Sequence, residues 1–449
     1  MNMTKTALPA WLQKENGGIC FLGIGGSGMY GVARLSHMLG FEISGCDGRE
    51  SQNLETLRKM KIPIFSEDAP LPQSICVLVY SLAVPEYHPW RKEAEARGIR
   101  TMDRAAFLGI LMRAFSVRAA VAGSHGKSTT TAMCAEILRR AGRSPTVVSG
   151  ASLAIGEDSF QWGEGDLLLV EACEYKDAFL SFSPTHALVL DASWEHPDYF
   201  SDKAAVLRSF SAFLSLDGLE HTVAPAGLFP ADVTFGEGGI YTARGRRTTR
   251  EGSSFLLCRE GETLGLVSLS VLGSYQVENA LGAAALCASL GVSDRDIVDG
   301  LSGFRGIGRR MEKRGYLHGA PLYLDFAHHP KELLYAIKTV LSLGRPAALV
   351  FEPHTYSRTK AFFEEYLFAL RLPHFTGVLP IYAAREKEDE SVSSLLLAKR
   401  AGVTALTDYR HAARFLTDAA EKGCTLLLAG AGGVEEVLSH LPFLFPAGG

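Results

Sequence analysis

Seven residues at positions 123–129, Gly-Ser-His-Gly-Lys-Ser-Thr, have the types and spacing of a loop that binds phosphate. Glycines leave the backbone N–H groups free to face an anion, and a helix beginning near Ser128 adds its positive end. Lys127 can reach the outer phosphates of a nucleotide, and the Ser128 hydroxyl can bind Mg²⁺. The loop is shorter than the common pattern because Val121 stands where the first glycine would be. The competing interpretation, a glycine-rich turn that happens to contain a lysine, is disfavoured by the apolar strand that precedes the loop.

A second glycine-rich loop follows an apolar strand at residues 19–22. Its residues are Gly23, Gly25, Gly26, Ser27 and Gly28. Asp47 ends the next predicted strand, about twenty residues further on. In this arrangement a helix N-terminus holds a diphosphate and the carboxylate bonds a ribose. The pattern fits NAD as well as a UDP-sugar, and a domain that binds nothing at this loop is the remaining alternative.

Acidic and imidazole side chains follow two apolar strands after the phosphate loop. Glu171 comes directly after residues 166–170, and His196 lies beyond residues 186–190. Because ligands bind beyond the carboxyl ends of parallel strands, we expect both residues to converge on the phosphate loop. Carboxylate and imidazole groups there suit a divalent cation bound to nucleotide phosphates. Glu195 and Asp198, taken singly, are expected to be solvated loop charges.

The last third of the chain alternates strands and helices again. Two histidines, His328 and His329, lie just past its first predicted strand, at the functional edge of a sheet. Without further ligands, a hydrogen-bonded or substrate-contacting pair is favoured over a metal site. Arg309 and Arg310 lie in a loop interrupted by glycines, which favours contact with an anion over a surface charge run.

Composition favours a small-molecule substrate. The 449 residues carry a net charge of −4, with 45 basic and 49 acidic side chains, so no electrostatic footprint for nucleic acid or an anionic membrane is present. Residues 1–12 lack the apolar stretch of a signal peptide, and no later run reaches the roughly 18 apolar residues of a membrane span. The eight cysteines form no pattern typical of disulfides or zinc. We therefore expect a cytoplasmic protein, and its oligomeric state stays open.

The predicted fold class is α/β with three domains. A Rossmann-like domain spans residues 1–115, a central ATPase-type domain with the phosphate loop spans 116–312, and a second Rossmann-like domain spans 313–449. Residues 220–270 read as a β-rich part of the central domain without assignable chemistry. In the last domain the pattern predicts one helix over 359–370 and a strand over 378–382.

The order of these motifs resembles the Mur ligase family across essentially the whole chain. The matching residues are Gly123 to Thr129, Glu171 to Tyr175, His196, Asn279, Arg309-Arg310, Asp325 with His328-His329-Pro330, Glu352-Pro353-His354 with Arg358, and Tyr382 to Glu386. The resemblance implies an ATP-dependent ligase of peptidoglycan precursor synthesis. The most similar members join L-alanine to the carboxylate of UDP-N-acetylmuramate through an acyl phosphate.

The resemblance also implies roles for individual residues. Lys127, Glu171 and His196 would be catalytic, and Ser128, Glu171 and His196 would hold Mg²⁺ at the two metal positions of the family. The implied ATP contacts are Gly123, Ser124, His125, Gly126, Lys127, Ser128, Thr129, Asn279, Arg310 and Asp325. The implied UDP-sugar contacts are Gly23, Gly25, Gly26, Ser27, Gly28, Asp47, Ser81 and His125. His328 and Arg358 would lie on the amino-acid side of the substrate site.

Three positions depart from the family pattern. Ser193 stands where the family usually has Glu, Gln276 where it has Asn, and Thr355 where it has Arg.

Four alternatives stay open beside alanine ligation. A nucleotide-binding regulator that has lost activity would explain Ser193 and Thr355 but not the retained Lys127, Glu171 and His196. A structural protein would have little use for the glycines of a phosphate site. A relative that attaches a preformed peptide to the same sugar nucleotide would share almost every motif. An NAD-dependent oxidoreductase would use the loop at 23–28 but leaves Lys127 unexplained.

Overall fold

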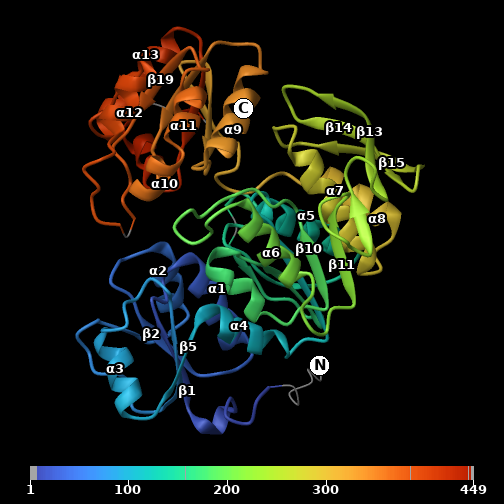
Figure 1. Ribbon diagram of the computed structural model, residues 1–449, viewed down its shortest axis with the longest axis vertical. Helices are drawn as coiled ribbons and strands as arrows, with labels where there is room; N and C mark the ends of the chain where they lie inside the picture. The colour runs from blue at the N-terminus through green and yellow to red at the C-terminus, as the bar shows by residue number, and fades with distance from the viewer. Residues whose placement is uncertain (1–7, 157, 385, 443, 446–449) are drawn as a thin grey trace.

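The computed structural model describes residues 8–156, 158–384, 386–442 and 444–445. They form three α/β domains, each built on one sheet, and Figure 1 shows them running from blue through green to red along the chain. The predicted fold class is confirmed, and the boundaries at 115/116 and 312/313 stay predictions. Arg385, within one of the matching motifs, lies outside the described residues.

The N-terminal sheet is parallel, with the strand order β3-β2-β1-β4-β5. Its strands are β1 (Gly18–Leu22), β2 (Ile43–Cys46), β3 (Ile64–Phe65), β4 (Ile75–Tyr80) and β5 (Arg100–Asp103). Its helices are α1 (Ser27–Met38), α2 (Gln52–Lys59), α3 (Pro89–Ala96) and α4 (Arg104–Met112). The chain changes direction across the sheet between β1 and β4. The glycine-rich loop after β1 therefore opens at the switch point where open α/β sheets bind ligands.

The central sheet has the strand order β15-β14-β13-β12-β11-β10-β6-β9-β7-β8. Its strands are β6 (Val117–Ala122), β7 (Thr146–Val148), β8 (Phe160–Gln161), β9 (Leu167–Glu171), β10 (His186–Val189), β11 (His221–Pro225), β12 (Val233–Phe235), β13 (Tyr241–Thr248), β14 (Ser253–Arg259) and β15 (Glu262–Leu269). Its helices are α5 (Lys127–Arg140), α6 (Lys203–Phe213), α7 (Gln276–Ser289) and α8 (Asp294–Gly303). Because β6 lies parallel between β9 and β10, the carboxyl ends of all three strands meet at the phosphate loop.

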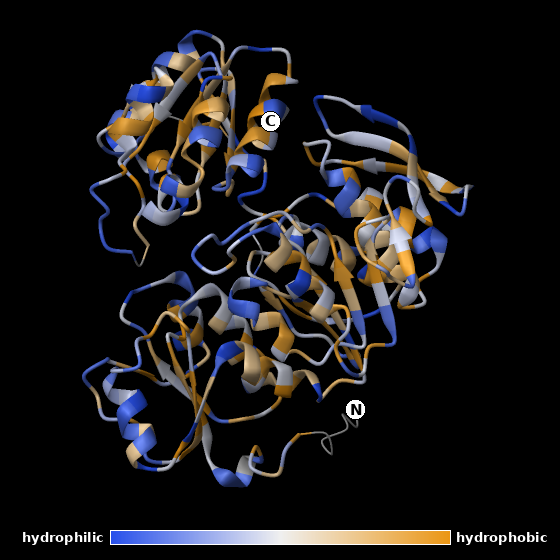
Figure 2. Cartoon of the chain, viewed as in Figure 1, coloured by the Kyte–Doolittle hydropathy of each residue, from blue (hydrophilic) through white to orange (hydrophobic). Residues whose placement is uncertain are grey.

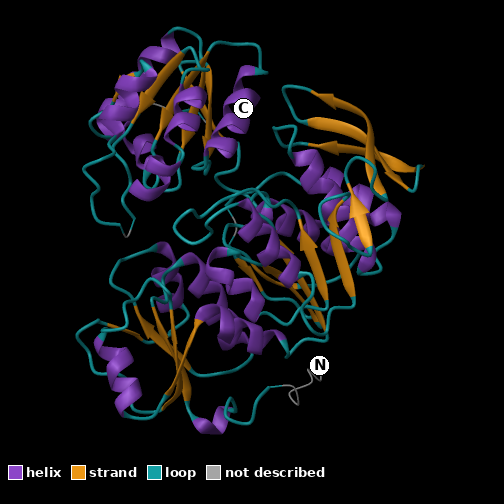
Figure 3. Cartoon of the chain, in the orientation of Figure 1, coloured by secondary structure: helices purple, strands orange, loops and turns teal. Residues whose placement is uncertain are grey.

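The C-terminal sheet has the order β16-β17-β21-β18-β19-β20, with only β16 antiparallel to its neighbour. Its strands are β16 (Glu312–Leu317), β17 (Ala320–Asp325), β18 (Ala347–Phe351), β19 (Phe375–Val378), β20 (Thr404–Ala405) and β21 (Thr425–Ala429). Its helices are α9 (Pro330–Leu341), α10 (Tyr356–Ala361), α11 (Phe363–Leu370), α12 (Ser394–Ala401) and α13 (Tyr409–Glu421). Figure 3 shows helices on both faces of this sheet.

The central strands of the sheets are buried because their side chains are apolar. Every residue of β1, β18 and β21 is buried, as expected for parallel strands covered by helices on both faces, and Figure 2 shows apolar residues concentrated on the strands. Strand β6 alternates between two cores. Ala120 and Ala122 face a core that also contains residues of the N-terminal domain, whereas Ala119 and Val121 face the core beneath α5 and α7. One strand thus fixes the phosphate loop relative to the N-terminal domain.

Two predicted elements of the C-terminal domain are wrong. The single helix expected over 359–370 is two helices, α10 and α11, separated at Phe362, whose backbone φ is −113° and ψ is 30°. The strand expected over 378–382 is β19, which ends at Val378. Pro380 follows and cannot donate a backbone hydrogen bond to a neighbouring strand.

Among the described residues, no helix is long and apolar enough to cross a membrane.

Candidate active site

The phosphate loop connects β6 to α5. Gly123 has a φ of +144° and Gly126 a φ of +82°, in the left-handed region that favours glycine. A Cβ added to Gly126 would lie 2.3 Å from Oδ1 of Asn279 on α7. Glycine is therefore required at 126 both by the backbone conformation and by the close approach of α7.

Lys127, at the start of α5, donates three hydrogen bonds to residues in and beside the loop. Its Nζ donates to Gly123 O at 2.5 Å, to Ser124 O at 3.2 Å and to Glu174 Oε2 at 2.9 Å. Burial alone would lower the pKa of Lys127, but the Glu174 carboxylate raises it. Burial likewise opposes ionisation of Glu174, yet Lys127 and His196 hold the pKa of Glu174 at about 2. Both members of the pair are therefore charged.

Ser128 and Glu171 are joined by a hydrogen bond. Ser128 Oγ donates to Glu171 Oε2 at 2.9 Å, and the same oxygen accepts from Ser149 Oγ at 3.0 Å and from Gly150 N at 2.8 Å. The bond brings together two of the three predicted metal ligands, because Glu171 ends β9 directly beside the phosphate loop.

His196, the third predicted ligand, lies beside two carboxylates. Its Nε2 is 3.4 Å from Glu174 Oε1 and 3.8 Å from Glu195 Oε2, and the three side chains form a group that could hold a metal ion. Glu195 is 5% exposed, and burial raises its pKa. The expectation that Glu195 is a solvated loop charge is therefore wrong, because the loop after β10 folds inward against the C-terminal domain.

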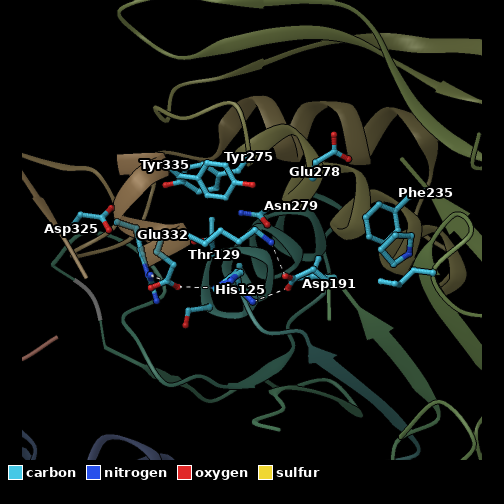
Figure 4. Close-up of a pocket in the computed structure, with 17 residues that line it drawn as sticks. His125, Thr129, Asp191, Phe235, Tyr275, Glu278, Asn279, Asp325, Glu332 and Tyr335 are labelled. Atoms are coloured by element: carbon cyan, nitrogen blue, oxygen red, sulfur yellow. Dashed lines mark hydrogen bonds and ion pairs between the residues drawn. The ribbon is translucent and has the colours of Figure 1, made fainter. Parts of the chain in front are cut away.

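A cavity of about 320 Å³ lies between the phosphate loop, α7 and α9 (Figure 4). Its wall contains seven of the ten predicted ATP residues: His125, Gly126, Ser128, Thr129, Asn279, Arg310 and Asp325. The other three, Gly123, Ser124 and Lys127, belong to the same loop but are not among the lining residues. The cavity therefore collects predicted residues from two domains that are far apart in sequence.

The two ends of this cavity differ in chemistry. Leu190, Pro225, Leu228 and Phe235 line an apolar part, whereas the phosphate loop supplies backbone N–H groups. Tyr275 and Tyr335 stack with ring centroids 5.5 Å apart at an interplanar angle of 28°. Figure 4 shows this pair above Asn279 and Thr129. Such a cavity suits a ligand with a flat ring at one end and an anion at the other.

Arg310 and Asp325 line the side formed by the C-terminal domain. Arg310 Nη1 is 3.8 Å from Glu332 Oε1. Asp325 Oδ2 accepts from Met311 N at 2.7 Å and its Oδ1 accepts from Ala327 N at 2.8 Å. Burial raises the pKa of Asp325 to about 6, against the lowering effect of Arg310. Asp325 thus also fixes the backbone where the chain enters the C-terminal domain.

His125 points from the phosphate loop toward the C-terminal domain. Its Nδ1 is 3.3 Å from Glu332 Oε1 and 3.9 Å from Glu195 Oε1, and its ring centroid is 5.3 Å from that of His329. Burial alone would lower the pKa of His125, but Glu332 raises it. His125 lines the cavity beside α9 and is not among the residues that line the hollow at the N-terminal loop, where it was also predicted.

His328 and Arg358 lie deeper in the C-terminal domain and meet through His354. Arg358 Nη1 is 3.2 Å from His354 Nδ1, and the His354 ring lies 5.6 Å from that of His328. Burial, reinforced by Arg358, lowers the pKa of His328 well below its usual value. Among the described residues, several buried polar atoms near this region have no hydrogen-bond partner: His125 Nε2, Glu195 Oε1, His329 Nε2 and Arg358 Nε. Such atoms favour a polar ligand at this place.

The N-terminal loop borders a second hollow of about 310 Å³. Its lining includes five of the predicted UDP-sugar residues, Gly23, Gly26, Ser27, Gly28 and Ser81, and also Glu171 from the central domain. Of the other three, His125 lines the first cavity, and Gly25 and Asp47 are joined to each other: Asp47 Oδ2 accepts from Gly25 N at 2.9 Å. Asp47 therefore holds the loop in shape, an effect in addition to any contact with a ribose.

Sequence reasoning missed Glu332, Arg104 and Lys331 as site residues. Glu174 belongs to the matching motif at 171–175 but was given no role of its own. Arg104 lines the N-terminal hollow, where a Cβ on Gly28 would lie 3.1 Å from Arg104 Cζ. Glu332 lies in the first turn of α9, and its Oε2 is 3.5 Å from Nδ1 of His328, which precedes the helix. An acidic residue two positions after the His328-His329-Pro330 motif could have identified Glu332, whereas Arg104 and Lys331 carry no local signal.

Two family models match the chain. The Mur ligase family catalytic domain matches residues 18–116, and the Mur ligase glutamate ligase domain matches residues 309–432. The chain is similar to the UDP-N-acetylmuramate–L-alanine ligase of Agathobacter rectalis, at 35% identity over 93% of this chain and 96% of the relative. It is also similar to the ligase of that name from Acetivibrio thermocellus, at 34% identity over 93% and 94%.

Solved structures share the fold. The UDP-N-acetylmuramate–alanine ligase of Thermotoga maritima superposes with a TM-score of 0.80 at 24% identity, covering 94% of this chain and 98% of that one. A murein peptide ligase from Psychrobacter arcticus gives a TM-score of 0.70 at 20% identity, covering 95% and 98%. A MurF ligase of Thermotoga maritima in complex with ADP gives 0.59 at 15% identity, covering 89% and 93%.

Proposed function

Because this chain belongs to the Mur ligase family, we propose that it joins L-alanine to the carboxylate of UDP-N-acetylmuramate with consumption of ATP. Relatives of that name at 31–35% identity over most of the chain support this reaction over the oxidoreductase alternative. The observation that carries the proposal is the bond from Ser128, which lines the ATP cavity, to Glu171, which lines the N-terminal hollow. Under this proposal, a nucleotide site and a sugar-nucleotide site would lie on either side of that one contact.

The reaction needs two steps because a carboxylate is a poor acyl donor. The muramyl carboxylate oxygen first attacks the γ-phosphorus of ATP, giving an acyl phosphate and ADP. The amine of L-alanine then attacks the acyl carbon, the amine proton is lost, and phosphate leaves as the amide forms. Most of the catalysis in phosphoryl transfer is positioning and neutralisation of charge.

The loop residues 123–129 would bind the phosphates of ATP, with Lys127 at the γ-phosphate. Asn279 would contact the adenine side, and Arg310 and Asp325 would contact phosphate and ribose from the hinge and the third domain. The Tyr275–Tyr335 stack and the apolar wall support an adenosine at the other end of the cavity. The charge that Glu174 maintains on Lys127 is available for the transferring phosphoryl group.

The residues beside the loop fit Mg²⁺. Hydroxyl and carboxylate oxygens are the ligands that Mg²⁺ prefers, and Glu174 Oε1 is buried without a hydrogen-bond partner among the described residues. Ser128, Glu171 and His196 would serve the two Mg²⁺ positions, with Glu174 beside His196. When bound, Mg²⁺ supplies positive charge that neutralises phosphate oxygens.

The substrates would be divided among the three domains. Residues 1–115 would bind the UDP-sugar through the loop at 23–28, residues 116–312 would bind ATP, and residues 313–449 would bind the amino acid. The unpartnered buried atoms near His328 and Arg358 support an amino-acid subsite there. Enclosure between domains would shield the acyl phosphate from water. We further propose that the protein acts in the cytoplasm, in peptidoglycan precursor synthesis.

A phosphate-release assay with the full chain tests the substrates. We expect phosphate from ATP only when UDP-N-acetylmuramate and L-alanine are both present, together with formation of the amide product. The matched reaction replaces L-alanine with a tripeptide. Turnover with the tripeptide but not with alanine would show that the chain attaches a preformed peptide instead.

A further inference from the structure

Helix α9 of the C-terminal domain carries a lysine across to the central domain. Lys331, in the first turn of α9, donates from Nζ to Ser193 Oγ at 2.6 Å, and the same Nζ lies 3.5 Å from Asp191 Oδ2. Ser193 and Asp191 follow β10 in the central sheet. The contact therefore joins elements of two different sheets.

The segment that Lys331 contacts also holds the phosphate loop. Asp191 Oδ1 accepts from His125 N at 2.8 Å, and Asp191 O accepts from Ser124 N at 3.3 Å. Ser193 O accepts from Ser124 Oγ at 2.8 Å, and Ser193 Oγ donates to Asp191 Oδ2 at 2.9 Å. Lys331, from the C-terminal domain, is thus linked to the backbone of the phosphate loop through one intervening residue, either Asp191 or Ser193.

The position of Lys331 indicates a role in linking the C-terminal domain to the phosphate loop, and not a role in folding stability. Its side chain is 39% exposed, and exposed ion pairs contribute little to the free energy of unfolding. Lys331, Asp191 and His125 all line the ATP cavity, however. A nucleotide in that cavity would displace water around the contact, and lower polarity strengthens interactions between charges.

We propose that Lys331 is a positioning residue that couples docking of the C-terminal domain to the geometry of the phosphate loop. With α9 docked, Lys331 holds the Asp191–Ser193 segment, and that segment holds the backbone of His125 and Ser124 in the phosphate-binding arrangement. With α9 undocked, the segment loses this restraint and the loop binds phosphate less well. The consequence for ligation rests on the proposed function, whereas the consequence for nucleotide binding does not.

Calorimetric titration of the full chain with a non-hydrolysable ATP analogue and Mg²⁺ tests the proposal. We expect Lys331→Met to bind the analogue about tenfold more weakly, a typical size for coupling between sites. Ser193→Ala should also weaken binding, and the double variant should bind no more weakly than Lys331→Met, since both changes remove one contact. Lys331→Arg, which keeps the charge and the reach, should restore most of the affinity.

Lys338→Met is the matched control, because Lys338 is exposed on the same helix, and it should bind the analogue as the parent does. Parent-like binding by Lys331→Met, or effects of Lys331→Met and Ser193→Ala that simply add, would overturn the proposal. If Lys331→Met does not fold, Ser193→Ala and Lys331→Arg still give the comparison. In ligation, Lys331→Met should lower kcat and leave KM for UDP-N-acetylmuramate unchanged. A parent protein that binds the analogue but does not ligate alanine would contradict the proposed function alone.

Discussion

Lys127 Nζ lies 2.9 Å from Glu174 Oε2, and the two side chains are 14% and 1% exposed. Glu174 keeps the lysine charged where burial alone would favour the neutral amine. The two other hydrogen bonds of the ammonium go to backbone oxygens of the loop, Gly123 O and Ser124 O. To reach a γ-phosphate, Lys127 must therefore exchange at least one of these partners for a phosphate oxygen.

Replacing Lys127 with Ala should lower the ligation rate by at least about a hundredfold, the usual effect of removing a group that stabilises transition-state charge. Binding of UDP-N-acetylmuramate, measured by calorimetry, should stay within about twofold of the parent. Because the single variant leaves the buried Glu174 carboxylate without its lysine, the double variant with Glu174→Gln is the control for folding. Ligation by Lys127→Ala at the parent rate would refute the ATP-site assignment.

Gly126→Ala should abolish nucleotide binding as well as strain the backbone. Its φ of +82° costs about 1–2 kcal/mol with any side chain, and its Cβ would meet Asn279 Oδ1. Gly142→Ala is the matched control, with a φ of +70° and no atom within 4 Å of the added Cβ. Both variants should lose stability in urea unfolding, and only Gly126→Ala should lose ADP affinity. Equal ADP affinity in the two variants would contradict the close approach of α7.

Asp47→Ala should weaken UDP-N-acetylmuramate binding about tenfold, because the N-terminal loop loses a charged acceptor for Gly25 N. ADP binding should not change, since Asp47 is not among the residues that line the cavity between the phosphate loop, α7 and α9. Both affinities can be measured by calorimetry. Asp68→Ala, at an exposed position in the same domain, is the control. Equal losses for both ligands would indicate general unfolding of the domain instead of a local effect.

His329→Asn should make the protein less sensitive to acid. Burial, reinforced by His125, lowers the pKa of His329 from 6.5 to about 3, so the folded protein keeps the ring neutral where the unfolded chain takes up a proton. The stability from His329 is present above pH 6.5 and is lost as pH falls toward 3. Between about pH 7.5 and about pH 5.5 the parent should lose about 1.4 kcal/mol more than the variant.

Asparagine is chosen because the His329 side chain caps α9 by accepting from Lys331 N, and asparagine is a good N-cap residue. Urea unfolding of both proteins at about pH 7.5 and about pH 5.5 gives the comparison. The same loss of stability in both proteins would mean that His329 is protonated in the folded state.

The glycine-rich loops and most strands and helices could be predicted because each depends on local pattern. A fully apolar run such as β1 predicts burial, and a glycine followed by Lys127 at the start of a helix predicts a loop that binds an anion. The break at Phe362 and the early end of β19 were missed. A periodic apolar pattern does not locate a helix break, and it does not show that a proline such as Pro380 ends a strand two residues earlier.

The three α/β domains, the two glycine-rich loops and the resemblance to the Mur ligases could be recognised from the sequence alone. Which charged groups meet depends on the tertiary structure. Glu195 is buried because the loop after β10 folds against the C-terminal domain, and Lys331 contacts Ser193 although 138 positions separate them. Local patterns report φ and ψ preferences and which face of an element is apolar. They do not report how domains dock, because docking depends on the shape and charge of the completed surfaces. The burial of Glu195 and the bond from Lys331 both result from that docking.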